Sequence, residues 1–135
     1  MTLTPELTAL AIIGTATAVM WVPYVVARIL SAGLIAAFGV PGPGYPTDAP
    51  WADRARRAHV NAVENLAVFA PLVLTAAISG VSTPATVLAS RLYVAARLAH
   101  YLIYVAGIPL ARTVAFLIGS FATLVVAEAI LRSAL

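Results

Sequence analysis

The longest apolar run of the chain spans residues 7–38 and contains one formally charged side chain, Arg28. This run exceeds the roughly 20 residues that an α-helix needs to cross the hydrocarbon core of a bilayer. The rest of the 135-residue chain has a similar character, because 62% of all residues are hydrophobic and 10% are charged. Soluble domains contain about 25% charged residues. We therefore predict that lipid surrounds most of this chain.

Proline and glycine divide the sequence into four helical segments. The predicted helices cover about residues 5–38, 52–79, 84–106 and 110–134, and a Pro- and Gly-rich loop occupies residues 39–50. Thr4-Pro5-Glu6 and Thr83-Pro84 are typical of helix starts, with threonine as the N-cap and proline as the first helical residue. One long and two short connections favour a single-domain, all-α, up-down four-helix bundle in the membrane, covering residues 1–135.

The distribution of arginine predicts the orientation of the bundle. Five arginines gather near the long loop and the third connection: Arg28, Arg54, Arg56, Arg57 and Arg112. Because positive charge accumulates on cytoplasmic loops, we expect the long loop to be cytoplasmic and both termini to lie outside. The net charge is only +3, and the arginines lie within or beside apolar segments, so no nucleic-acid partner is expected. The chain contains no cysteine, which excludes a thiolate nucleophile of its own, and no metal site is predicted.

The second predicted helix carries a polar stripe near its start. Arg54, Arg57, Asn61 and Glu64 follow one another at i, i+3, i+7 and i+10, which places them on one helical face. Arg54, like Arg56, is expected to be an anchor at the membrane interface. The other three members of the stripe are candidates for binding a ligand or, alternatively, for tying helices together.

A second polar stripe lies on the third predicted helix. Arg97, Tyr101 and Tyr104 follow at i, i+4 and i+7, and His100 lies beside them. We expect Tyr101 to serve in packing. Arg97, His100 and Tyr104 are candidates for contact with a ligand.

Charge balance at this end of the bundle indicates an anionic partner. Each predicted helix brings an arginine there: Arg28, Arg57, Arg97 and Arg112. Glu64 is the one acid there that we expect to be buried. Burying an unpaired charge costs several kcal/mol. The arginines of this cluster outnumber the acid that could balance their charge, so the chain alone cannot neutralise it. The missing partner is predicted to be an anionic small molecule or lipid headgroups.

These residues resemble the signature of the MAPEG family, the membrane-associated proteins in eicosanoid and glutathione metabolism. The resemblance lies in three segments: Arg57-Ala-His59-Val-Asn61-Ala-Val-Glu64, Arg97-Leu-Ala-His100-Tyr-Leu-Ile-Tyr104 and Arg112-Thr113. The resemblance extends over essentially the whole chain, including its length and helix count. The segment Trp21-Val-Pro-Tyr24 and the Pro-rich loop are similar to the bacterial branch, which implies a location in the bacterial inner membrane.

The resemblance implies a homotrimer that binds glutathione, or a related low-molecular-weight thiol, between neighbouring subunits. By position, Arg57, Asn61 and Glu64 would hold the carboxylate and amino ends of the peptide. Contacts from other helices would come from Arg97, His100, Tyr104 and Arg28, the last of them across the subunit boundary. Arg112 would stabilise the thiolate. The implied function is a glutathione-dependent transferase or peroxidase that acts on small lipophilic electrophiles in the bilayer.

Other readings remain open at this point. Phe116 stands where some family members have a tyrosine hydroxyl near the thiol, so specialised thiol chemistry is not implied. The alternative function is a non-enzymatic structural or accessory subunit whose arginine-rich site binds lipid or another anion. Haem binding through His59 and His100 is less favoured, because His59 lies off the polar face. A proton-coupled exporter using Glu64 is disfavoured as well, because the adjacent Arg57 would keep that carboxylate charged.

Overall fold

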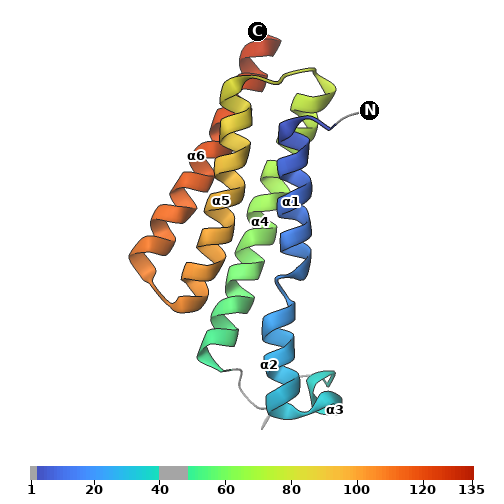
Figure 1. Cartoon of the computed structure of the whole chain (residues 1–135), viewed down its shortest axis with the longest axis vertical. Coiled ribbons are helices and arrows are strands. Elements are labelled where there is room, and N and C mark those ends of the chain that lie inside the picture. Colours follow the sequence, from blue (N-terminus) through green and yellow to red (C-terminus); the bar gives the residue numbers. More distant parts are fainter. Residues whose placement is uncertain (1–2, 40–48) are drawn as a thin grey trace.

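The computed structural model describes residues 3–39 and 49–135, and the secondary structure within these ranges is helical (Figure 1). The helices are α1 (Pro5–Val19), α2 (Val22–Ala32), α3 (Leu34–Ala37), α4 (Pro50–Ile78), α5 (Pro84–Ala106) and α6 (Pro109–Ala134). The predicted all-α bundle is confirmed. Most of the predicted loop over residues 39–50 lies outside the described residues, which omit 40–48.

The first predicted helix, residues 5–38, is not continuous. It ends as α1 at Val19, resumes as α2 at Val22, and breaks again at Gly33, whose φ is +83°. Pro23 explains the first break, because its nitrogen cannot donate a hydrogen bond and its ring collides with the carbonyl of the preceding turn. The Met20 amide instead closes a tighter turn on the Thr17 carbonyl, at 3.2 Å. The expectation of one helix over this range was therefore wrong.

The predicted helix starts are confirmed by their caps. The Thr4 hydroxyl accepts a hydrogen bond from the Leu7 amide at 3.3 Å. Thr83 and Thr86 exchange side chain-to-backbone bonds of 3.1 and 2.8 Å, a reciprocal cap that satisfies two otherwise orphaned amides. At the other end of α5, Gly107 has a φ of +79°, which lets the chain reverse within two residues before α6.

Helix α5 lies at the centre of the bundle. It packs along α6 and also contacts α1 and α4, whereas α2 projects beyond α1 and packs against α4 (Figure 1). The core is formed where α1, α4, α5 and α6 meet, by Ile13, Phe69, Val73, Tyr93, Ala122 and Val126 among others. The rings of Phe69 and Tyr93 stack with centroids 3.7 Å apart. Because α4 and α5 each contact at least three other helices, polar residues on the inner faces of both can be enclosed.

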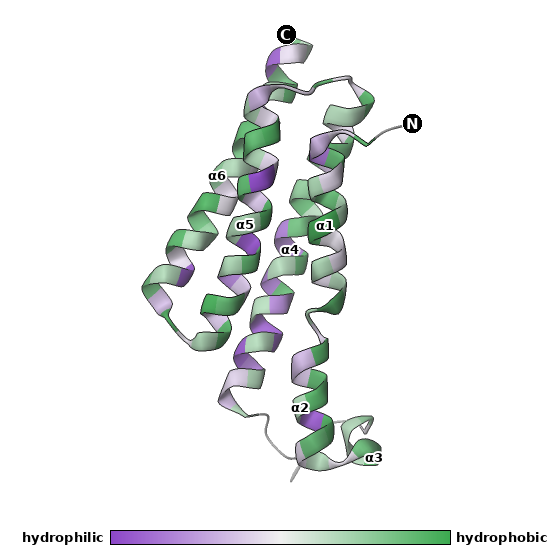
Figure 2. Cartoon of the chain, in the orientation of Figure 1, coloured by the Kyte–Doolittle hydropathy of each residue, from purple (hydrophilic) through white to green (hydrophobic). Residues whose placement is uncertain are grey.

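Three segments of the described residues are long and apolar enough to cross a membrane: Pro5–Ala32, Pro50–Ile78 and Pro109–Ala134. Helix α5 has 23 residues and runs alongside them, but it carries Arg91, Arg97 and His100. Arg97 and His100 are buried, so most of the polar side chains of this helix point into the bundle. Figure 2 shows polar residues gathered on the loop-proximal half of α4 and along α5, while α1 and α6 are largely apolar. The chain is therefore an integral membrane bundle.

Candidate functional site

Two adjoining hollows lie where α4, α5 and α6 meet. We call the first the α4 hollow; it measures about 310 Å³ and is lined by Arg56, Arg57, Val60, Asn61, Glu64 and Tyr104. We call the second the α6 hollow; it measures about 280 Å³ and is lined by Asn61, His100, Tyr104, Arg112, Thr113 and Phe116. Both include Asn61 and Tyr104, so the two hollows form one continuous polar surface. Six of the eight predicted site residues line it.

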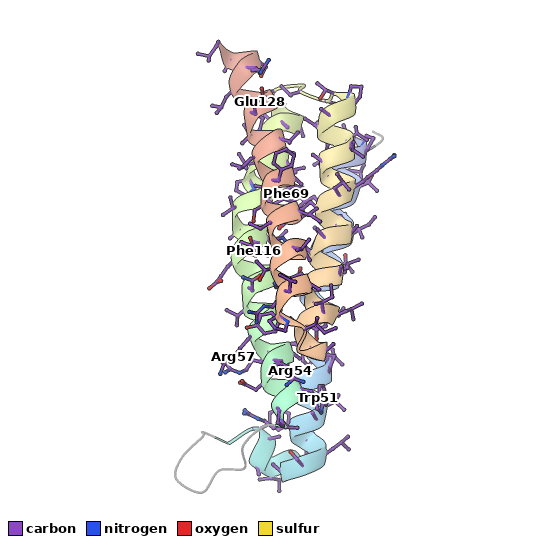
Figure 3. The ribbon with its side chains drawn as sticks, turned by 90° about the vertical axis from the view of Figure 1, so that its left-hand side faces the viewer. Trp51, Arg54, Arg57, Phe69, Phe116 and Glu128 are labelled. Atoms are coloured by element: carbon purple, nitrogen blue, oxygen red, sulfur yellow. The ribbon has the colours of Figure 1, made fainter. Side chains whose placement is uncertain are left out.

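The α4 hollow is built on the predicted stripe of the second helix. Arg57, Asn61 and Glu64 line one hollow, as their spacing required. The Nε of Arg57 donates to Oδ2 of Asp53 at 2.8 Å, and Nη2 of Arg56 donates to Oδ1 at 3.2 Å. Arg57 points outward from α4 (Figure 3), and its side chain is 63% exposed. Such exposed ion pairs contribute at most about 1 kcal/mol, so both guanidinium groups can exchange Asp53 for an incoming carboxylate.

The α6 hollow is built from stacked rings and a guanidinium. The rings of His100 and Tyr104 meet edge to face with centroids 5.6 Å apart. The Cζ of Arg112 lies 4.5 Å from the centre of the Tyr104 ring, a cation–π contact. Arg112 belongs to the first turn of α6, directly after the short reversal at Gly107. The arrangement presents a positive group on a rigid aromatic wall, which suits the stabilisation of a small anion.

Arg97, a predicted site residue, lies behind the α6 hollow and does not line it. It is 2% exposed, and its Nη2 donates to Oδ1 of Asn65 at 2.7 Å. Its Cζ lies 5.1 Å from the centre of the Tyr93 ring and 5.2 Å from that of Phe116. Gly119 gives the guanidinium its space, because a Cβ there would fall 2.8 Å from Nε. Arg97 thus supports the wall of the hollow from inside the bundle.

Sequence reasoning missed Asn65. Its amide nitrogen donates to the Asn61 carbonyl at 2.8 Å and lies 3.3 Å from the Asn61 side-chain oxygen, while its own oxygen accepts from Arg97. Asn65 therefore connects the buried guanidinium to a residue shared by both hollows. The sequence feature that could have revealed it is an asparagine one turn after Asn61, directly before the apolar run that begins at Leu66.

The burial of the acidic side chains differs most from the prediction. Glu64 is exposed, so the prediction that it is buried was wrong for this chain taken alone. Among the residues that the structure describes, the buried carboxylate is Glu6, which is 3% exposed and lies at the other end of the bundle. Ser82 and Thr86 donate to its Oε1 at 2.9 and 2.6 Å. Glu128 and Arg132, toward the same end, form an exposed i, i+4 ion pair.

The remaining polar residues of this end connect helices. Arg54, expected to be an interfacial anchor, donates from Nε to the Val105 carbonyl at 2.9 Å and so caps the end of α5. The Tyr101 hydroxyl donates to the Met20 carbonyl at 3.0 Å, which agrees with a packing role. The Tyr24 hydroxyl and Nδ1 of His59 lie 3.0 Å apart and join α2 to α4. Arg28 lies on α2, half-buried, and is not among the residues that line either hollow.

Comparison with known proteins identifies the family. The family model described as "MAPEG family" matches residues 7–132, nearly the whole chain. This chain belongs to the MAPEG family. Every residue that lines the two hollows lies within the matched range.

Individual relatives of this MAPEG protein are microsomal glutathione S-transferases. The chain is 38% identical over 84 residues to "Microsomal glutathione S-transferase 1" of Bos taurus, which covers 62% of this chain and 54% of the relative. The proteins of the same name from Sus scrofa and Homo sapiens are 37% and 36% identical over the same length. The matched segment thus spans about half the length of these relatives.

Proposed function

We propose that this protein is a glutathione-dependent membrane transferase or peroxidase that acts on small lipophilic electrophiles. The observation that carries the proposal is the composition of the two joined hollows. They bring three guanidinium groups, one carboxylate, one amide and one imidazole to a single surface at one end of a membrane bundle. The names of the relatives in the MAPEG family support the same ligand.

The charges of the hollows complement those of glutathione. Glutathione carries two carboxylates and one ammonium group. Arg56 and Arg57 can each form charge-assisted bonds to a carboxylate, with a planar fork that favours two-point contact. Glu64, exposed beside them, is available to the ammonium group. Asn61 lies in both hollows and can bond to the peptide backbone between the charged ends.

Arg112 is the residue that we assign to the chemistry. A guanidinium beside the glutathione sulfur favours the thiolate, which is the nucleophile, over the thiol. In the transferase reaction the sulfur forms a bond to the electrophilic carbon, and the leaving group departs with its electron pair. In the peroxidase reaction two thiols are oxidised to a disulfide while a hydroperoxide is reduced to an alcohol and water. Phe116 offers no hydroxyl to the sulfur, so the proposal assigns the stabilisation of the thiolate to the charge of Arg112.

A homotrimer in the bacterial inner membrane, with the long loop cytoplasmic and both termini outside, completes the proposal. Both hollows are open at the surface of the single chain, and Glu64 is exposed beside them. A neighbouring copy would cover this face, contribute its Arg28 to the site, and leave a path from the bilayer for the hydrophobic substrate. Closure by a second copy would also bury Glu64, as the sequence suggested.

Isothermal titration of the detergent-purified protein with glutathione tests the proposal. We expect saturable binding that is weakened at least tenfold in Arg57→Ala, because about 1.4 kcal/mol of a charge-assisted bond is lost. Arg132→Ala is the matched control, because this arginine is exposed at the opposite end and pairs only with Glu128 among the described residues. Binding that is absent, or equal in Arg57→Ala and Arg132→Ala, would contradict the proposal. Anionic lipid that co-purifies with the wild type and is lost in Arg57→Ala, in the absence of glutathione binding, would favour the non-enzymatic accessory subunit.

A further inference from the structure

A second cationic site lies at the end of the bundle opposite the two hollows. Arg91 of α5 lines a groove of about 400 Å³ between α5 and α1. The other lining residues are Leu3, Pro5, Thr8, Ala9, Ile12 and Val94. Arg91 is therefore the one charged group in an apolar groove, and neither the MAPEG signature nor the proposed reaction uses it.

The groove continues along α1. A second hollow of about 510 Å³ shares Leu3, Thr8 and Ile12 with the first and extends to Thr15 and Ala16. From Pro5 to Ala16 the two hollows follow about three turns of α1, which is about 16 Å along the axis. An apolar track of that length, with a single guanidinium near one end, has the shape and polarity of a site for an acyl chain joined to an anionic headgroup.

The charge of Arg91 has no counter-ion in the part of the chain that the structure describes. Two acids lie toward this end, and neither is paired with Arg91; Oε2 of Glu6 is buried without a hydrogen-bond partner. Glu6 accepts hydrogen bonds from Ser82 and Thr86, and Glu128 pairs with Arg132. The balancing anion must therefore come from the surroundings.

The position of Arg91 along α5 indicates that this anion is a lipid phosphate. It lies seven residues after Pro84, which places its backbone about 10 Å from the start of α5. The long arginine stem can lift the guanidinium from this depth to the level of the lipid phosphates. Snorkelling alone would explain an isolated exposed arginine, but it does not explain an arginine that borders an apolar groove continuing along a neighbouring helix.

We propose that this groove binds one anionic phospholipid, with its phosphate on Arg91 and one acyl chain along α1 from Thr8 to Ala16. The site is distinct from the glutathione site in position and in ligand. It would hold a lipid at the non-cytoplasmic end of the bundle, where the sequence offers few other basic groups.

Native mass spectrometry of the purified full chain tests this proposal. The probes are phosphatidylglycerol and phosphatidylcholine with identical acyl chains. We expect one phosphatidylglycerol per chain to bind more tightly than phosphatidylcholine, and Arg91→Gln to weaken its binding about fivefold and abolish the preference. Arg132→Gln is the matched control, because it removes an exposed arginine at the same end that lines neither groove. Equal affinity for phosphatidylglycerol in wild type and Arg91→Gln would overturn the proposal.

A second variant examines the acyl track. Thr8→Trp places a large ring at an exposed position where the two hollows join, and we expect it to weaken both lipids while leaving the helical circular dichroism unchanged. Unaltered lipid binding in Thr8→Trp would show that the acyl chain does not lie there. If Arg91→Gln changes the oligomer distribution but not lipid affinity, the groove is a contact between copies and the lipid proposal fails.

Discussion

Arg97 is the most unusual residue of the bundle, because a guanidinium is enclosed here with one hydrogen-bond partner among the described residues. Nη2 is bonded to Asn65, whereas Nε and Nη1 are buried without a partner. The faces of Tyr93 and Phe116 compensate in part, since cation–π contacts gain strength where water is excluded. The stability of the protein should therefore depend on the space around the Arg97 guanidinium as well as on its hydrogen-bond partners.

The space around Arg97 is testable at Gly119. In Gly119→Ala the new Cβ falls 2.8 Å from Nε and 2.9 Å from Cζ of Arg97. Because the guanidinium is enclosed, it cannot move freely, and we expect a loss of about 1–3 kcal/mol of stability from overpacking. Chemical unfolding in detergent micelles measures this loss.

Gly14→Ala is the control for Gly119→Ala. Gly14 also lies in the middle of a helix, but a Cβ there meets nothing within 4 Å. We expect this substitution to stabilise the protein by about 0.5–1 kcal/mol, because alanine restricts the unfolded chain. Changes of the same sign in both variants would show that helix propensity, and not the contact with Arg97, dominates at Gly119.

Arg112 is the residue on which turnover depends in the proposed mechanism. In Arg112→Ala we expect kcat for conjugation of an aryl halide to fall about 100-fold, as when one group that stabilises a developing anion is removed. The ultraviolet absorbance of the glutathione thiolate bound to the protein should decrease in parallel. Arg132→Ala should retain both signals. Full turnover in Arg112→Ala would remove Arg112 from the chemistry.

At the scale of the element, α2 is among the helices least constrained by packing. None of its residues is buried, and it packs against α4 and the short α3. The bond between Tyr24 and His59 joins it to α4 at 3.0 Å, and the break at Pro23 separates it from α1. Arg28 lies on this helix, so the position of that arginine depends on a small number of contacts.

Tyr24→Phe tests how α2 is held. Loss of one partly buried hydrogen bond costs about 0.5–1.5 kcal/mol, so hydrogen exchange of the α2 amides should accelerate about 2- to 10-fold. The amides of α1 should exchange as before, because the substitution lies beyond the break. Tyr101→Phe is the matched control: it removes the bond to the Met20 carbonyl and leaves the Tyr24–His59 contact intact. Equal exchange of α2 in Tyr24→Phe and wild type would show that packing alone holds this helix.

At the scale of the whole molecule, the proposed trimer is tested by mixing two defective chains. Arg28→Ala and Arg112→Ala subunits, co-expressed with different tags, are each expected to bind glutathione poorly. If neighbouring subunits share each site, one of the three sites in every mixed trimer, about a third of the sites, will contain both arginines. Titration of the doubly tag-purified protein should therefore recover a fraction of the binding. No recovery would indicate that each site belongs to one chain.

The sequence predicted the class of the molecule, and it grouped candidate residues that the structure brings to one surface. The four apolar segments, the threonine caps and the stripe of Arg57, Asn61 and Glu64 on one face all agree with the structure. Pro23 indicated a kink, but the division of residues 5–38 into three helices, with a second break at Gly33, was not predicted, because apolarity continues through the breaks. Asn65 was missed because its partner, Arg97, lies on another helix, and no spacing within one segment reveals that contact.

The sequence by itself determined that this chain is a helical membrane bundle with arginines gathered at one end. Hydropathy, proline, glycine and caps act within a few residues, so they can be read along the chain. Only the tertiary structure decided that Arg97 is enclosed, that Glu64 is exposed, that Glu6 is the buried acid, and that Arg91 borders a groove. These outcomes depend on how each helix is rotated about its axis and offset along its neighbours. Contacts between distant residues set that rotation and offset.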